Sequence, residues 1–149
     1  MRLTTVLKSV GIFAAVFAAL SVGVMYAFFS SLPDLCGNEV ISEVLSPDGT
    51  RKAVVFSRDC GATTDVSTQV AVLKLGESLG SNPESVLAAD TNRGTAARGA
   101  WGGPEVIAHW NSASELVVRV ATGARILRSG SSPSAITIKH ELAEERNGG

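Results

Sequence analysis

The sequence predicts an all-β domain that follows one N-terminal transmembrane helix. Three observations lead to this prediction: a charge-free apolar run at residues 10–29, eight short apolar runs after it, and turn-forming residues between those runs. Short strands separated by turns are typical of all-β folds built from neighbouring antiparallel hairpins. We therefore expect an antiparallel meander of about 6–8 short strands, forming a curled sheet or a small sandwich.

The apolar run is long enough to cross a lipid bilayer. As a helix it spans about 30 Å, the thickness of the hydrocarbon core. Arg2 and Lys8 precede the run, whereas Asp34 and Glu39 follow it. The positive-inside rule therefore predicts a single-pass protein of the inner or plasma membrane, with a cytoplasmic N-terminus at residues 1–9 and an extracytoplasmic C-terminal domain.

A secreted protein, released by cleavage of a signal peptide, is the alternative. Signal peptidase sites need small residues, but Met25 stands two residues before Ala27, and the bulky Phe28 and Phe29 follow it. The apolar run is also longer than the 7–15 residues that are usual for a signal peptide. These features favour a retained anchor.

The two cysteines, Cys36 and Cys60, both lie beyond the apolar run. An even pair in an oxidising compartment predicts a disulfide, and no C-x-x-C spacing supports a redox-active thiol. In the chain-entropy model, closing a loop of this length stabilises a domain by about 3–4 kcal/mol.

Net charge argues against nucleic acid as a partner. Without Arg2 and Lys8, the 13 basic residues fall to 11 against 14 acidic ones, which gives the exported part a net charge near −3. Nucleic-acid binding requires a basic face that this composition does not offer.

The exported part is predicted to contain a tether at 30–38, a β domain at 39–140 and a polar tail at 141–149, the tail being a short frayed helix or disordered. The expected strands are residues 40–45, 52–57, 68–75, 86–89, 105–110, 116–120, 125–127 and 135–139.

Local patterns specify two hairpins and the centre of the sheet. In the sequence Ser46-Pro47-Asp48-Gly49, proline presets φ and Gly49 can adopt the positive φ that closes a turn. Residues 105–110 and 116–120 alternate apolar and polar side chains and are expected to pair across a second turn. Residues 53–56 and 70–73 are apolar on both faces, which predicts central strands that are covered above and below.

Several motifs together resemble those of a known family. They are Cys-Gly-Asn-Glu at 36–39, the Ser-Pro-Asp-Gly turn with Ala-Val-Val-Phe at 53–56, Arg-Asp-Cys-Gly-Ala-Thr-Thr at 58–64 with Gln-Val at 69–70, and Gly-Gly-Pro-Glu-Val at 102–106. This set resembles a family of small bacterial proteins, exported or membrane-anchored, that is classified as a domain of unknown function. The resemblance covers residues 35–120, implies an anchored or secreted β domain, and implies no activity.

Two polar loops form the candidate binding surface. Residues 58–67 gather carboxylates and hydroxyls around the predicted disulfide, and residues 91–104 form a 14-residue connection with glycines, arginines and a tryptophan. Unstructured connections longer than about 12 residues are uncommon in compact domains and are often functional. The candidate residues are Arg58, Asp59, Thr63, Thr64, Asp65, Asp90, Asn92, Arg93, Arg98 and Trp101.

Each loop also has a structural interpretation. The polar side chains of 58–67 can hydrogen-bond the loop's own backbone. Trp101 can anchor a protein partner or a glycan if it is exposed, or fold back to cap the core. The glycines can form an anion-binding nest with Arg93 or Arg98, although no strand and helix frame them as in a P-loop.

The sequence does not predict a catalytic, cofactor or metal site. His109 and His140 are the only histidines, and two histidines do not make a structural zinc site when the cysteines bond to each other. Acidic ligands with EF-hand spacing are missing. The pattern G-x-S-x-G occurs once, at residues 76–80, but it does not stand between a predicted strand and a predicted helix, as a nucleophile elbow does. We expect both histidines at surface or rim positions.

The sequence leaves three functions open. The favoured one is an envelope binding or accessory module whose loops 58–67 and 91–104 contact another envelope protein or a polar ligand. The first alternative is a hydrolase-like enzyme that uses His109 or His140 with a serine, which requires a serine oxygen about 3 Å from a histidine nitrogen in a cleft. The second is a structural subunit that contacts a partner through small residues of its transmembrane helix.

Overall fold

The computed structural model describes residues 2–30, 36–130 and 135–143, and the chain divides into two units, residues 1–34 and 35–149. The first unit contains helix α1 (Arg2–Ser30). The second contains strands β1 (Gly37–Leu45), β2 (Arg51–Asp59), β3 (Ser67–Lys74), β4 (Leu87–Asp90), β5 (Val106–Ser112), β6 (Glu115–Val120), β7 (Arg125–Ser129) and β8 (Thr137–Leu142).

Helix α1 contains the predicted apolar run. Its segment Val10–Phe29 is long and apolar enough to cross a membrane, as the sequence predicts. The hydroxyl of Ser21 donates to the carbonyl oxygen of Phe17 at 2.9 Å, so the run's serine is satisfied within the helix. A satisfied hydroxyl adds little cost to an apolar helix in lipid.

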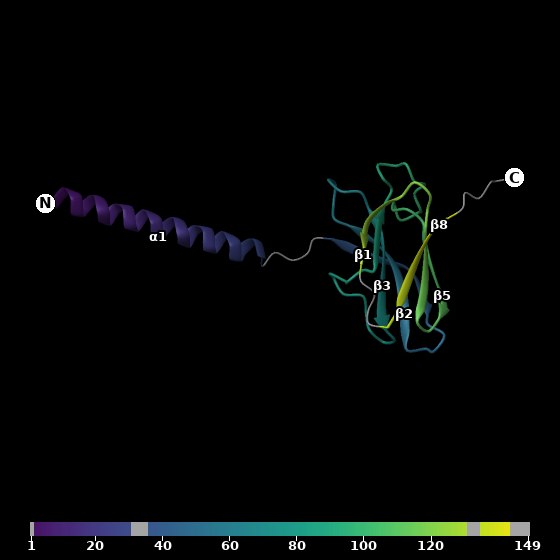
Figure 1. Ribbon diagram of the computed structural model, residues 1–149. Coiled ribbons are helices and arrows are strands. Elements are labelled where there is room, and N and C mark those ends of the chain that lie inside the picture. Colours follow the sequence, from purple (N-terminus) through teal and green to yellow (C-terminus); the bar gives the residue numbers. More distant parts are fainter. Residues whose placement is uncertain (1, 31–35, 131–134, 144–149) are drawn as a thin grey trace. The chain divides into compact units, whose positions relative to one another are not determined.

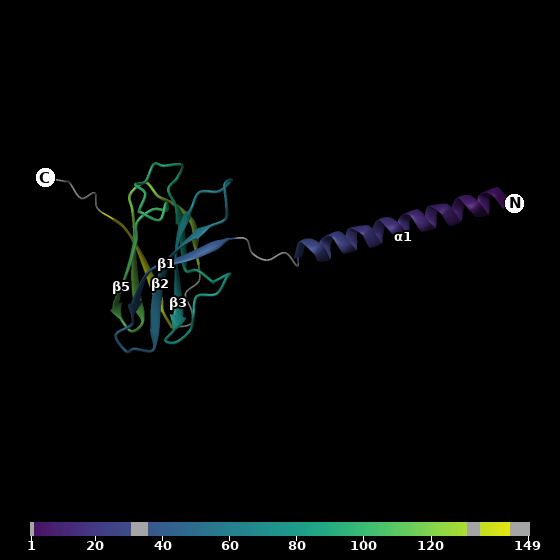
Figure 2. The same cartoon turned by 180° about the vertical axis from the view of Figure 1, so that it is seen from behind.

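The second unit is a sandwich of two sheets, which confirms the predicted all-β fold. A five-stranded sheet has the order β1-β2-β3-β4-β7, and a three-stranded sheet has the order β5-β6-β8. Figures 1 and 2 show the two layers from opposite sides. Each of the eight predicted strands overlaps an observed one.

The main core lies between the two sheets. Alternate residues of β2, β3, β5 and β6 face it, because successive side chains of a strand point to opposite faces. The five-stranded sheet contributes Val55 and Val70, and the three-stranded sheet contributes Leu116 and Val118, all fully buried. The remaining buried members are Ala53, Val86, Leu87, Ala89, Val106, Ala108, Val120 and Ile136.

The outer face of the five-stranded sheet is covered as well. Val54, Phe56 and Ala71 are fully buried there and pack against Leu73 and Leu79. Leu79 belongs to the segment that joins β3 to β4. The prediction that the strands at 53–56 and 70–73 are central is confirmed, and a connecting segment contributes to the cover on this face.

Both predicted hairpins are present. In the β1–β2 turn, Gly49 has φ = 68° and its N–H donates to the carbonyl oxygen of Ser46 at 2.9 Å. Asp48 accepts the Ser46 hydroxyl at 2.6 Å, which ties the turn together. Strands β5 and β6 pair antiparallel, with Ala108 opposite Val118 on the core side, as the alternation predicts.

One pairing departs from a simple meander. Strand β8 pairs with β6 in parallel, because β7 lies between them in sequence but joins the other sheet, beside β4. All other strand pairs are antiparallel. The connection between β7 and β8 includes residues 131–134, which lie outside the described residues.

The disulfide joins the beginning of β1 to the end of β2. Cys36 and Cys60 are bonded, with 4.1 Å between their Cα atoms, which confirms the prediction. The strands extend beyond the predicted domain boundaries of 39 and 140, because β1 begins at Gly37 and β8 ends at Leu142. Residues 144–149 of the predicted tail lie outside the described residues.

Candidate functional site

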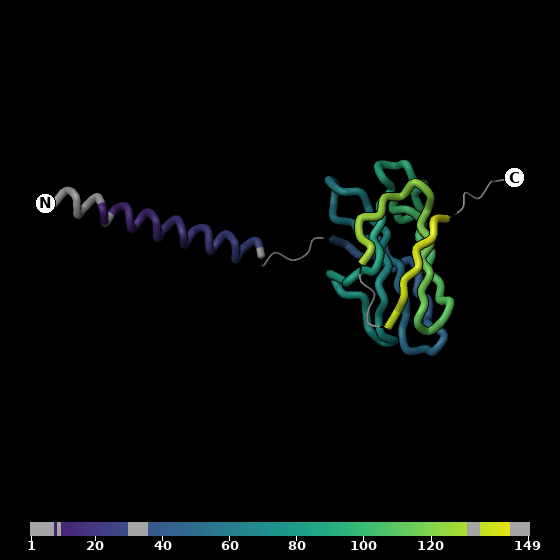
Figure 3. Tube along the Cα trace, viewed as in Figure 1, coloured from purple at the N-terminus to yellow at the C-terminus, as the bar shows by residue number. Residues whose placement is uncertain are grey.

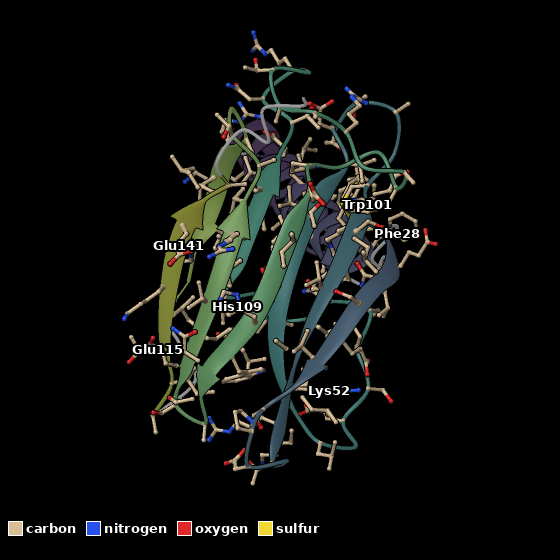
Figure 4. The ribbon with its side chains drawn as sticks, turned by 90° about the vertical axis from the view of Figure 1, so that its right-hand side faces the viewer. Phe28, Lys52, Trp101, His109, Glu115 and Glu141 are labelled. Atoms are coloured by element: carbon tan, nitrogen blue, oxygen red, sulfur yellow. A yellow bond between two sulfur atoms is a disulfide. The ribbon has the colours of Figure 1, made fainter. Side chains whose placement is uncertain are left out.

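The two predicted loops lie at one end of the sandwich. Residues 60–66 connect β2 to β3, and residues 91–105 connect β4 to β5. We call these two segments the loop platform. Figure 4 shows Trp101 of the platform at one end of the sheets and Lys52, near the β1–β2 turn, at the opposite end.

Asp65 links the two loops of the platform. Its Oδ2 accepts a hydrogen bond from the hydroxyl of Thr91 at 3.2 Å, and its Oδ1 lies 3.8 Å from Nη2 of Arg98. Both charged side chains are partly exposed, so the ion pair itself contributes little stability. The carboxylate therefore joins the loops at the surface while it stays accessible to solvent.

Trp101 folds back onto the domain. Its Nε1–H donates to the hydroxyl oxygen of Thr68 at 2.9 Å, and that hydroxyl donates to the carbonyl oxygen of Pro104 at 2.7 Å. A Cβ on Gly99 would lie 2.6 Å from the indole ring, so only glycine fits beneath it. The half-buried tryptophan is therefore a structural part of the platform. This agrees with the interpretation that it folds back onto the domain, and not with that of an exposed anchor.

The backbone at the start of the second loop forms a tight turn. Asn92, Arg93 and Gly94 have φ values of 51°, 57° and 86°, and the N–H of Gly94 donates to the carbonyl oxygen of Thr91 at 3.1 Å. Positive φ at both central residues is the type I′ arrangement, which strains the side-chain-bearing Arg93. The turn holds Arg93 exposed at the surface.

Several N–H groups in and beside this turn donate to the protein's own oxygens. The N–H of Asn92 donates to Oδ1 of Asp90 at 2.9 Å. The N–H of Ala96 donates to the carbonyl oxygen of Thr91 at 3.0 Å. These N–H groups are therefore engaged by a carboxylate and a carbonyl group of the protein itself.

Asp90 is buried and paired with Arg125 of β7. Two nitrogens of the Arg125 guanidinium donate to the Asp90 carboxylate: Nε to Oδ1 at 3.2 Å, and Nη2 to Oδ2. The Arg125 hydrogen bond, with help from the Asn92 N–H, holds the pKa of Asp90 below its usual value despite burial. Asp90 therefore fixes β7 to the end of β4 and supports the platform from beneath.

The remaining predicted residues of loop 58–67 do not share one surface. Arg58 donates to Oδ1 of Asn38 and to the carbonyl oxygen of Ser81, both at 2.9 Å, so it contacts the β3–β4 segment rather than the platform. Asp59 accepts the N–H of Gly61 at 2.9 Å, which is the backbone role proposed as the alternative. Thr64 likewise bonds the carbonyl oxygen of Gly61, and Thr63 is exposed.

A hollow of 1020 Å³ adjoins the platform, and the sequence prediction missed it. Thr95 and Ala97 of the second loop form part of its wall. The sequence carries one signal of this hollow, because Ile107 is an apolar residue on a strand face whose other residues are polar. In the structure Ile107 is half exposed. The other lining residues are Glu105, Arg119, Ala121, Thr122, Glu141, Leu142 and Ala143.

The two histidines occupy different places. His109 lies on the outer face of β5, opposite Val117 of β6. Nε2 of His140 lies 3.1 Å from the hydroxyl oxygen of Ser129 on β7. Both residues of this pair are exposed, and neither lines the hollow. The pair therefore meets the distance that a serine–histidine enzyme requires, but it does not lie in the hollow described above.

Among the residues that the structure describes, no group of three or more histidine, cysteine, aspartate or glutamate side chains is arranged to hold a metal ion. Within the same residues, every buried side-chain nitrogen and oxygen has a hydrogen-bond partner. The platform is thus a satisfied network whose exposed rim carries the side chains that can meet a partner.

No protein-family model, curated protein or solved structure matches this chain significantly. The resemblance to a family of exported bacterial proteins therefore stays a prediction, and any function has to be argued from the residues themselves.

Proposed function

We propose that the protein is a membrane-anchored envelope module that binds another envelope protein through its loop platform. The single observation that carries this proposal is the contact of Asp65 with both Thr91 and Arg98, which joins two polar loops into one surface. Loops held by a rigid scaffold are frequent binding sites.

Preorganisation supports the proposal. Trp101 is fixed by Thr68, and the strained turn at Arg93 is held by Asp90 and Thr91. A surface that is already ordered loses little conformational entropy when it binds. Backbone strain of this kind persists where the surrounding structure enforces it, and it is often associated with functional sites.

The exposed groups define the chemistry of the partner. Arg93 and Arg98 present guanidinium groups at the rim, and Asp65 and Asn92 add polar oxygens. Guanidinium groups bind carboxylates in a planar, bidentate geometry. The partner surface we expect therefore combines carboxylates with hydrogen-bond donors.

The location is part of the proposal. Helix α1 carries the apolar run, basic residues precede it and acidic residues follow it in the sequence. These charges favour a cytoplasmic N-terminus and an envelope-exposed β domain. Protease added to spheroplasts should digest the domain while the cells stay intact; digestion only after lysis would contradict this orientation.

Site-specific photo-crosslinking tests the binding surface. A photoreactive residue at Arg98 in the full-length chain should give a discrete adduct in living cells, and the same residue at Thr50 should not. Thr50 is a matched control because it is also exposed but lies in the β1–β2 turn, close in sequence to Lys52, which Figure 4 shows at the opposite end of the sandwich. Identical adduct patterns from the two positions would exclude the platform as the binding surface.

Hydrolysis is a second candidate function, favoured by one distance. Ser129 and His140 are 3.1 Å apart, which is within reach for proton transfer from a serine nucleophile. A fluorophosphonate probe should then label the wild-type chain and spare both the Ser129→Ala and His140→Ala variants. Absence of labelling in the folded wild-type protein would remove this candidate.

A further inference from the structure

Among the strands that the structure describes, β8 has a free edge that differs from the other three sheet edges. Strands β1, β5 and β7 each have a register shift in their pairing with the neighbouring strand. Strand β8 pairs with β6 over six consecutive residues without a shift, and it ends the three-stranded sheet. Regular, unprotected edges are templates for another strand, and bulges are one device that proteins use against such pairing. Figure 3 shows β8 in yellow along this edge.

The side chains of β8 leave an apolar group in solvent. Leu142 is 71% exposed although its register opposite Val120 places it on the core-facing side of the strand. Ile138, on the same side, is only half-buried. A strand added beside β8 would cover both side chains.

The outer face of β8 carries one half of a charge pattern. Lys139 bonds Glu115 of β6 at 3.1 Å, and Arg119 of β6 bonds Glu141 at 2.8 Å. Figure 4 shows Glu115 and Glu141 along this side of the sandwich. Charges of opposite sign therefore alternate from β6 to β8, and each row ends at the free edge.

We propose that a second copy of this chain pairs with β8 through its own β8, antiparallel, with His140 opposite His140 of the second copy. In this register Lys139 lies opposite Glu141 of the second copy, and Ile138 lies opposite Leu142. Each charge row then continues across the interface with alternating sign, from Glu115 through Lys139 to the second copy's Glu141 and Arg119. The exposed leucine gains an apolar neighbour.

The charge pattern selects this register among its neighbours. Centring the pair on Lys139 would put two lysines directly opposite each other, and centring it on Glu141 would oppose two glutamates. Like charges in directly opposed positions destabilise a strand pair. An edge-to-edge contact of six residues is small for a stable complex, so it suits chains that a common membrane concentrates.

A charge exchange between two chains tests the proposal. Full-length Lys139→Glu and Glu141→Lys chains, with different epitope tags, are co-expressed and purified from membranes. Each variant opposes like charges when it pairs with itself, but the mixed pair opposes unlike charges at both positions. We expect the mixed pair to be recovered about 5- to 30-fold more than either variant paired with itself.

A second ion pair provides the matched control. Lys52 and Glu43 are 3.0 Å apart on β2 and β1, so their exchange also removes one ion pair from each chain. When Lys52→Glu and Glu43→Lys chains are co-expressed, the mixed pair should be recovered no more often than either variant paired with itself. Equal recovery of mixed and unmixed pairs for the β8 variants would overturn the proposal.

Cysteine crosslinking tests the register independently, should a charge variant fail to fold. His140→Cys places two cysteines directly opposite each other, about 4.5–5.5 Å apart at Cα, which a disulfide can bridge. Thr137→Cys on the same strand leaves its copies about 20 Å apart. Under mild oxidation we expect a covalent dimer from His140→Cys at least tenfold above Thr137→Cys, and equal yields would overturn the proposed register.

Discussion

The two open sides of the sandwich are fastened in different ways. On one side, Trp110 of β5 packs against the main core and its Nε1–H donates to the carbonyl oxygen of Val44 in β1 at 3.0 Å. On the other side, the hydrogen bond described between β7 and β8 is that of Ser129 with His140, and both residues are exposed. The large apolar side chains exposed there are Ile126 at 45%, Leu127 at 52% and Leu142 at 71%.

This difference indicates where the domain is closed and where it can accept another chain. A packed indole whose N–H is satisfied combines apolar burial with a hydrogen bond, and both are lost if the sheets separate. An exposed hydrogen bond competes with water and contributes little. We therefore expect stability to depend on the β1–β5 side and association on the β7–β8 side.

The largest effect is expected from Trp110→Ala. Removing a packed indole and its hydrogen bond should lower the free energy of unfolding by about 3 kcal/mol, measured by urea denaturation of the β domain. Trp110→Phe keeps most of the apolar volume and leaves only the Val44 carbonyl without its partner, so it should cost about 1 kcal/mol. Equal, small losses in both variants would show that this side is not the closed one.

A smaller effect is expected from Asp90→Asn, which weakens the attachment of β7 to β4. The variant loses the ionic partner of Arg125, and we expect a loss of about 2 kcal/mol at pH 7. Since the pKa of Asp90 is lowered in the folded state, its stabilisation is complete above the unfolded value of 3.8 and is lost as pH falls through the folded value. The difference between wild type and variant should therefore shrink below about pH 4.

Glu43→Gln is the control for Asp90→Asn. Glu43 pairs with Lys52 at 3.0 Å, but the glutamate is 44% exposed, so its loss should cost at most about 0.5 kcal/mol. A pH-independent difference for Asp90→Asn would mean that the residue acts through packing and not through its charge.

Local patterns predicted the strands but not their assignment to sheets. The turn at Gly49 and the alternation around Ala108 specify neighbouring pairs, and both pairs are observed. Nothing in the Arg125–Ser129 segment indicates that it joins β4 rather than β6, because that choice depends on the fit of whole layers. Because β7 joins the other sheet, β8 pairs with β6 in parallel, and no local sequence pattern indicates this pairing.

The candidate site shows the same division. Loop length and composition identified both segments of the platform, but the role of each side chain depends on contacts distant in sequence. Trp101 is held by Thr68, and Asp65 reaches Arg98. Arg58 lies in one of the predicted segments and contacts the β3–β4 segment instead, because alternate residues of a strand end point to opposite faces.

The smallest effect on stability is expected from Ser129→Ala, which removes the described hydrogen bond between β7 and β8. Both partners are exposed, so water replaces the lost contact and the free energy of unfolding should change by less than about 0.5 kcal/mol. The same urea measurement used for Trp110→Ala makes the two sides directly comparable. A loss above about 1.5 kcal/mol would mean that the β7–β8 side is fastened as firmly as the other, and an added strand would then have to displace an established contact.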